Sequence, residues 1–419
     1  MAERTTPATN GSGSPPPARP QPLGAFPLPA GYLLVPGGED TEEARRDLVA
    51  GRLPGRWPEA LRAHELALAG DVAGALAHLT GDDPVTRYNR FVMDPEAEDP
   101  ALLRRDLGEP YGVLADVVAF TVGRAAEPPE PGAADGEIAA LALAARAGHA
   151  MDQGDPARAV RLLEEAVGKA PEEAAPLAGV LLAAAAGIRK DAEGPGPEVI
   201  AMLERALRLL DGTDLRVGRA EAHLTLALTL HESAGDRPDL LSRAVPHYQA
   251  ALRLVTSDEA PEVWAAAHVN LATAYLTMPM REASDRLRVA IAVRSLRSAL
   301  KIYTRETHPV EWAGAQLNLA NALVYAPSGH QADNLVEAVE LYEAVLEARP
   351  REQDPLGRAR VLANQGNALA HLGMFDHARA KLAEARYLFE EGGDVDAVRT
   401  VRDVLDGIAR QTALIKARG

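Results

Sequence analysis

The stretch "AQLNLANALVYAPSGHQADNLVEAVELYEAVLEARP" at residues 315–350 decides the fold of this chain. Its first part, "AQLNLANAL", spaces small and apolar residues three and four positions apart, which is typical of a helix that packs closely on a neighbour. After a short loop, residues 334–350 repeat this spacing. The stretch therefore predicts two helices that pack against each other as a hairpin.

The same pattern recurs on both sides of this stretch. Similar first helices are predicted at 222–230 ("AHLTLALTL"), 267–275 ("AHVNLATAY") and 361–369 ("VLANQGNAL"), each followed by a second periodic segment at 240–255, 287–303 or 376–389. Repeated two-helix units stack on their neighbours and bury a continuous core. Aromatic residues make up only 4% of the chain, and the apolar residues are mostly Ala, Leu and Val, which favours helix over sheet. We therefore predict an all-α fold with no sheet.

The repeats resemble the tetratricopeptide repeat. Two units carry the residues on which this resemblance rests: Gly154, Ala159, Leu163, Ala166 and Pro171 in one, and Gly366, Gly373, Phe375, Ala378, Leu382 and Ala385 in the other. The central units look like the longer kinesin-light-chain variant, with inserted segments at 277–286 and 325–334. The resemblance implies a right-handed α-solenoid in which the first helix of each unit faces a concave groove.

Composition along the chain predicts five regions. Residues 1–30, rich in Pro, Gly, Ser and Thr, are expected to form a disordered tail. An N-terminal helical block follows at 31–125, with a helical hairpin at 58–81. Prolines and glycines at 126–137 predict a linker. The repeats occupy 138–393, and residues 394–419 are expected to form a capping helix.

Charge and composition narrow the possible partners. The formal net charge is −16, and nucleic acids and anionic membranes attract basic proteins, so we expect a protein or peptide partner, no nucleic acid and no membrane. The absence of Cys excludes disulfides, thiolate metal sites and Cys nucleophiles. No signal-peptide pattern and no long uncharged apolar run is present, so we expect a cytoplasmic protein. The oligomeric state stays open.

Five asparagines are the predicted partner-binding residues: Asn270, Asn318, Asn321, Asn364 and Asn367. The resemblance places them on the concave side of successive first helices. A primary amide has two donors and an acceptor, so it can hold the backbone of an extended peptide without selecting a side chain. The alternative is that asparagine at these positions belongs to the repeat consensus and serves helix packing, and the sequence leaves both interpretations open.

A second candidate is a basic stripe formed by Arg294, Arg297 and Lys301, which are three and four positions apart. It is a possible docking surface for an acidic partner. Alternatively, these side chains pair with carboxylates inside the repeat array, for example Glu311 or Asp285.

No pattern in the sequence points to catalysis. Neither a zinc-protease H-E-x-x-H, a phosphate-binding P-loop nor a G-x-S-x-G motif is present, and the histidines are not spaced as metal ligands. We therefore predict a non-enzyme with no catalytic residues, no metal site and no cofactor.

The function predicted from the sequence is that of a scaffold or adaptor that binds a partner protein or an extended peptide in its groove. Two alternatives rest on resemblance alone. One is an accessory or assembly factor for a metalloenzyme, such as those associated with bacterial [NiFe]-hydrogenase gene clusters. The other is a regulatory repeat module of a signalling system.

Overall fold

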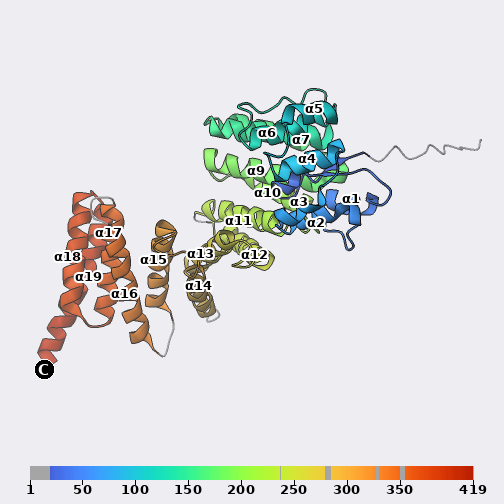
Figure 1. Ribbon diagram of the computed structural model, residues 1–419. Helices are drawn as coiled ribbons and strands as arrows, with labels where there is room; N and C mark the ends of the chain where they lie inside the picture. The colour runs from blue at the N-terminus through green and yellow to red at the C-terminus, as the bar shows by residue number, and fades with distance from the viewer. Residues whose placement is uncertain (1–18, 236, 279–284, 327–329, 350–353, 419) are drawn as a thin grey trace, which may run out of the picture. The chain divides into compact units, whose positions relative to one another are not determined.

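The computed structural model describes residues 19–235, 237–278, 285–326, 330–349 and 354–418 (Figure 1). Within these ranges almost all regular structure is helical, so the predicted all-α fold of consecutive helical hairpins is confirmed. The chain divides into two compact units, residues 1–215 and 216–419, and each is described by itself.

The first unit contains short strands, three 3-10 helices and ten α-helices within its described residues. Their bounds are β1 Gln21–Pro22, η1 Ala30–Tyr32, β2 Leu34–Val35, α1 Glu42–Val49, η2 Glu59–Leu61, α2 Arg62–Leu68, α3 Val72–His78, α4 Pro84–Met93, α5 Pro100–Leu107, α6 Gly112–Thr121, α7 Gly136–Asp152, α8 Pro156–Lys169, η3 Glu172–Ala174, α9 Ala175–Glu193 and α10 Pro197–Leu209.

The second unit consists of hairpins in which a first helix is followed by a second one. The first helices are α11 Arg216–Glu232, α13 Pro261–Thr277, α15 Pro309–Tyr325 and α17 Pro355–His371. The second helices are α12 Pro238–Leu254, α14 Asp285–Ala299, α16 Gln331–Ala348 and α18 Phe375–Glu391. Successive first helices contact each other, and a final helix, α19 Val395–Arg418, packs on α17 and α18.

Local sequence explains where many helices begin and turn. At α8 the Asp155 carboxylate accepts a hydrogen bond from the Arg158 N–H at 2.9 Å, and Pro156 occupies the first helical position. Proline costs little there, since its missing N–H would have no partner in the helix anyway. The same Asp-Pro pair begins α4, α5 and α17. The turn before α8 uses Gly154 at φ +73°, a conformation that favours glycine.

Small residues let the helices of a hairpin approach closely. In the α17–α18 hairpin, a Cβ atom on Gly366 would lie 2.6 Å from Leu382 Cγ, so only glycine fits without a shift. On the facing helix, Ala378 and Ala385 are fully buried. The many alanines of the chain therefore serve, as in this hairpin, to let neighbouring helices pack closely.

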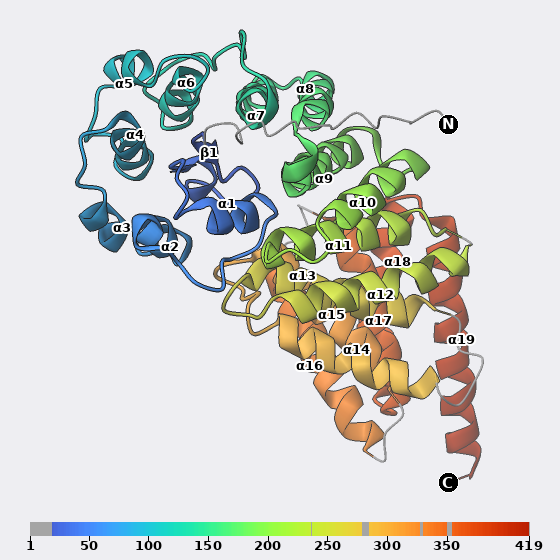
Figure 2. The same cartoon turned by 90° about the vertical axis from the view of Figure 1, so that its right-hand side faces the viewer.

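The N-terminal segment (residues 19–35) corrects the predicted tail. Residues 1–18 lie outside the described residues, but Leu23, Phe26 and Ala30, which belong to the predicted tail at 1–30, are buried in the core of the first unit. The prediction of no sheet is also wrong in detail, because β1 and β2 of this segment form a two-residue antiparallel pair. Figure 2 shows β1 and α1 lying inside the arc formed by α2 to α9.

The predicted linker at 126–137 does break the helices, since α6 ends at Thr121 and α7 begins at Gly136. It does not separate two cores, however. One hydrophobic cluster runs from Leu23 to Leu215 and includes Ala134. The N-terminal block and the first repeats therefore share a single core, and the boundary between the two units falls later, between residues 215 and 216.

Candidate functional site

The five predicted asparagines, called here the asparagine row, lie on three successive first helices. Asn270 is on α13, Asn318 and Asn321 are on α15, and Asn364 and Asn367 are on α17. All five side chains are partly exposed. The repeat spacing therefore places them on first helices, as the alignment of the units predicts.

Several amides of the row bond to one another or to neighbouring helices. Asn318 Nδ2 donates to Thr273 Oγ1 on α13 at 3.3 Å, and Asn364 Nδ2 donates to Asn321 Oδ1 at 3.0 Å. These bonds join α15 to α13 and α17 to α15. The row is therefore in part a set of packing contacts between successive first helices, which was one of the two interpretations of the sequence.

The side chain of Asn321 accepts two hydrogen bonds from other side chains. Besides the amide of Asn364, its Oδ1 accepts a hydrogen bond of 2.7 Å from the hydroxyl of Tyr342 on α16. Tyr342 is almost fully buried, and that burial raises its pKa well above the ordinary value. Asn270 is engaged differently, because its amide donates to the Ala266 carbonyl one turn earlier in the same helix at 2.8 Å.

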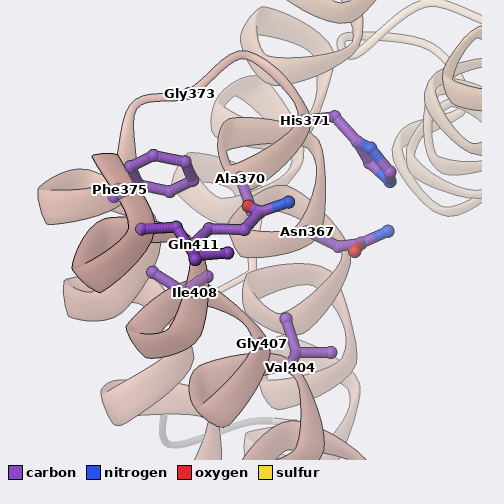
Figure 3. A pocket seen from close by; sticks show the side chains of 10 residues that line it. Asn367, Ala370, His371, Gly373, Phe375, Val404, Gly407, Ile408 and Gln411 are labelled. Atoms are coloured by element: carbon purple, nitrogen blue, oxygen red, sulfur yellow. The ribbon is translucent and has the colours of Figure 1, made fainter. Parts of the chain in front are cut away.

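Asn367 has no side-chain hydrogen bond within the described part of the chain, and it borders two hollows. The Tyr325 hollow has a volume of about 280 Å³ and is lined by Asn321, Val324, Tyr325, Tyr342, Asn364 and Asn367. The Phe375 hollow has a volume of about 610 Å³ and is lined by Asn367, Ala370, His371, Gly373, Phe375, Val404, Gly407, Ile408, Gln411 and Leu414. Figure 3 shows Asn367 and His371 projecting from α17 on the same side.

The predicted basic stripe is not a single helical surface. Helix α14 ends at Ala299, so Lys301 lies beyond it. Arg297 forms an ion pair with Glu337 of α16 at 2.8 Å, in place of the expected Glu311, and the side chain of Asp285 lies outside the described part of the chain. Arg294, the first residue of the stripe, acts on His268 of α13: burial and, to a smaller extent, the charge of Arg294 lower the pKa of His268 to about 4. The contacts of Arg297 thus favour pairing within the repeat array over a docking surface.

The first unit contains an internal contact between a side-chain amide and the main chain that the sequence did not reveal. The Leu34 N–H donates to Asn89 Oδ1 at 2.8 Å, and Asn89 Nδ2 donates to the Leu34 carbonyl at 2.8 Å. One side-chain amide therefore holds both backbone groups of a residue in an extended segment. Leu34 is fully buried and Asn89 is 2% exposed, so water does not compete for these bonds.

Other side chains hold the same segment. His64 Nε2 donates to the Leu34 carbonyl at 3.0 Å, and the Tyr88 hydroxyl donates to the Tyr32 carbonyl at 3.0 Å. Burial lowers the pKa of His64 to about 4, which keeps the ring neutral. The only sequence signal for this contact is a polar residue, Asn89, between the apolar residues of α4, and that signal does not identify its partner.

A pair of histidines lies in the α11–α12 hairpin. His223 Nδ1 and His247 Nδ1 are 2.9 Å apart, close enough for one ring to donate to the other. Burial, followed by the neighbouring charges of His247, Arg219 and Arg253, lowers the pKa of His223 to about 4. Across the described residues, no three His, Asp or Glu side chains gather closely enough to hold a metal ion.

Among the helices of the described residues, none combines the length and the apolarity that crossing a membrane requires.

No protein-family model matches the chain, and no curated protein matches its sequence. Among solved structures, a Rap protein complexed with competence and sporulation factor is 14% identical, over 85% of this chain and 98% of that chain, with a TM-score of 0.42. Yeast Tom70 is 12% identical over 85% of this chain and 82% of its own, with a TM-score of 0.28. A human IFIT1 dimer with PPP-AAAA is 14% identical over 87% of this chain and 98% of that chain, with a TM-score of 0.29. Likeness at this level says nothing about what this chain binds.

Proposed function

We propose that this protein is a non-enzymatic interaction scaffold whose second unit binds an extended segment of a partner protein along the asparagine row. The observation that carries the proposal is the contact between Asn89 and Leu34, in which an amide of this same chain holds an extended backbone by two hydrogen bonds. The asparagine row presents the same chemical group on three neighbouring helices. Asn367, which has no side-chain partner in the described part of the chain, has both its donors and its acceptor available.

The charge of the residues that line the two hollows favours a protein ligand over a nucleic acid. None of the described residues that line the Tyr325 and Phe375 hollows is Lys or Arg. Nucleic-acid binding depends on cationic side chains that neutralise phosphates, and this chain carries a formal net charge of −16. Amides and apolar groups instead suit the backbone and the uncharged side chains of a polypeptide.

A peptide-display selection tests the proposal. Random twelve-residue peptides are selected on the immobilised full-length protein, and enriched peptides are synthesised and titrated against variants. Asn318→Ala combined with Asn367→Ala removes the two row amides with the weakest internal bonding. Each lost interface hydrogen bond is worth roughly 0.5–1.5 kcal/mol, so affinity should fall about five- to a hundredfold.

Asn334→Ala is the matched control, because Asn334 is a partly exposed asparagine on a second helix, α16, outside the row. It should leave affinity unchanged. If no peptide is enriched, or if the double variant binds as tightly as the wild type at equal melting temperature, the proposal is wrong.

A further inference from the structure

The Phe375 hollow lies at the end of the asparagine row, between α17 and the last helix, α19. It shares Asn367 with the Tyr325 hollow, so the two hollows are neighbours along the row. Its volume of about 610 Å³ falls within the range of roughly 300–1,000 Å³ that ligand-binding pockets occupy. It is therefore large enough for a side chain and the backbone that carries it.

Small residues keep this hollow open. Ala370 on α17 and Gly407 on α19 both line it. A Cβ atom added to Gly407 would meet only the end of the Arg410 side chain, at 3.9 Å, and one added to Gly373 would meet nothing within 4 Å. At Ala370, Gly373 and Gly407 the wall of the hollow is therefore formed by backbone or a single methyl group, which leaves space beside the larger lining residues.

The lining of the hollow defines the chemistry of its ligand. Phe375 and Ile408 contribute apolar surface, while Asn367, His371 and Gln411 contribute the polar groups (Figure 3). No Asp, Glu, Lys or Arg is among the described lining residues. In a chain with a net charge of −16, an uncharged, partly apolar hollow complements an uncharged apolar side chain.

Exposed apolar side chains at the hollows point to the same ligand. Leu414 on α19 is 59% exposed at the Phe375 hollow, and Tyr325 is 65% exposed at the Tyr325 hollow. Met374, which lies between the lining residues Gly373 and Phe375 in the sequence, is 43% exposed. Large apolar side chains that gather in one exposed region mark interaction surfaces more often than scattered ones do.

The N-terminal segment shows within this protein how such a ligand is held. There Asn89 binds the backbone of Leu34, and the adjacent apolar side chains of Leu33 and Val35 are buried. An amide that binds the backbone therefore works beside an apolar environment for the side chains. Asn367 and the apolar surface of the Phe375 hollow offer the same two components, without an occupant from the described part of the chain.

We infer that the Phe375 hollow binds one large aliphatic or aromatic side chain of an extended, uncharged segment of a partner protein, with Asn367 and Gln411 bonding to the backbone beside it. This inference rests on the proposed function and adds its specificity: the asparagines hold the main chain, and the hollow selects the side chain.

The probe is a peptide enriched on the full-length protein by the display selection described above, together with analogues in which its conserved apolar residue is replaced by Ala or Lys. The protein variants are Gly407→Leu, which fills the hollow, and Leu414→Ser, which changes an exposed lining residue and leaves the core intact. Fluorescence polarisation gives the affinity of each pair, and circular dichroism confirms that each variant keeps the helicity of the wild type.

The enriched peptides should share a Leu, Ile, Phe or Met at one position. Replacing it by Ala should weaken binding to the wild type at least tenfold, and by Lys more strongly. Gly407→Leu should weaken the parent peptide at least tenfold and bind the parent and the Ala analogue almost equally. Leu414→Ser should weaken the parent peptide in the same direction even if Gly407→Leu fails to fold.

The experiment distinguishes an error in the proposed function from an error in the role of the Phe375 hollow. If no peptide is enriched, both the proposed function and this inference are overturned. If peptides bind and lose affinity on Asn318→Ala with Asn367→Ala, but show no apolar preference and bind Leu414→Ser normally, the asparagine row stands and the role of the hollow is refuted.

Discussion

At the scale of single residues, the five asparagines are not equivalent. Asn321 accepts hydrogen bonds from both Tyr342 and Asn364, whereas Asn367 has no side-chain partner in the described part of the chain. A polar group that already bonds inside the protein contributes to stability, and one that does not is available to a ligand. We therefore expect substitution of Asn321 to reduce mainly the stability of the fold, and substitution of Asn367 to reduce mainly the affinity for a ligand.

Asn321→Ala should reduce the free energy of unfolding by about 1–3 kcal/mol, because the buried Tyr342 hydroxyl loses its acceptor. Urea unfolding monitored by circular dichroism measures this change, with Asn334→Ala as the control on α16. An Asn321→Ala protein as stable as the wild type would mean that the Tyr342 bond contributes nothing.

At the scale of helices and hairpins, a glycine is essential where an added Cβ atom would lie too close to the facing helix. Gly366→Ala should destabilise the α17–α18 hairpin by about 1–3 kcal/mol, because its Cβ would lie 2.6 Å from Leu382 Cγ. Gly314→Ala in α15 is the matched control, since its Cβ would meet nothing within 4 Å. That change should be neutral or stabilise the helix by up to about 1 kcal/mol. Equal melting temperatures for the two variants would contradict the packing described here.

The α11–α12 hairpin should be sensitive to acid. A histidine in the unfolded chain has a pKa near 6.5, whereas that of His223 is lowered to about 4. Between these values the unfolded state binds more protons, so the contribution of His223 to stability should be constant above about pH 6.5 and decrease as the pH drops towards 4. His223→Gln should make this fall shallower in melting-temperature measurements from pH 7.5 to 4.5.

The control for this measurement is His377→Gln, at an exposed position of α18. It should retain the wild-type dependence on pH. An identical slope for wild type and His223→Gln would show that the His223–His247 contact does not couple to folding.

The helical hairpins could be predicted from sequence because their determinants are local. Gly154 and the Asp-Pro helix starts act within a few residues of their own positions, and Gly366 acts within a single hairpin, on Leu382. The bonds between Asn318 and Thr273 or between Asn364 and Asn321 could not be predicted in the same way. They depend on the distance between two helices and on side-chain rotamers, which the repeat pattern does not specify.

At the scale of the whole molecule, the N-terminal segment shows the limit of compositional reasoning. The Pro and Gly content of residues 19–30 is typical of disorder, yet Gln21 bonds to Glu137, 116 positions later, and the Pro20 carbonyl accepts a hydrogen bond of 2.8 Å from the Tyr111 hydroxyl. Composition describes what a segment does alone, and these contacts come from distant parts of the first unit. The separation into two units at residue 215 likewise falls inside a repeat pattern that continues across it.

Asn89→Ala should destabilise the first unit alone. The buried Leu34 N–H would lose its acceptor, at a cost of roughly 1–3 kcal/mol. Hydrogen exchange followed by mass spectrometry should show faster exchange for residues 23–35 and for α4, with α15 to α18 unchanged. Equal acceleration in both units would mean that they unfold as one cooperative body.

The burial of the N-terminal segment also has a consequence for biosynthesis. Gln21 bonds to Glu137, which the ribosome adds 116 residues later. At roughly 5–20 residues per second, that interval lasts about 6–23 s. During it, α2 and α4, which contact η1 and β2, are already synthesised, but α7, which contacts β1, is not. The segment around β1 thus completes its native contacts only after α7 has emerged, and its apolar residues are accessible to chaperones until then.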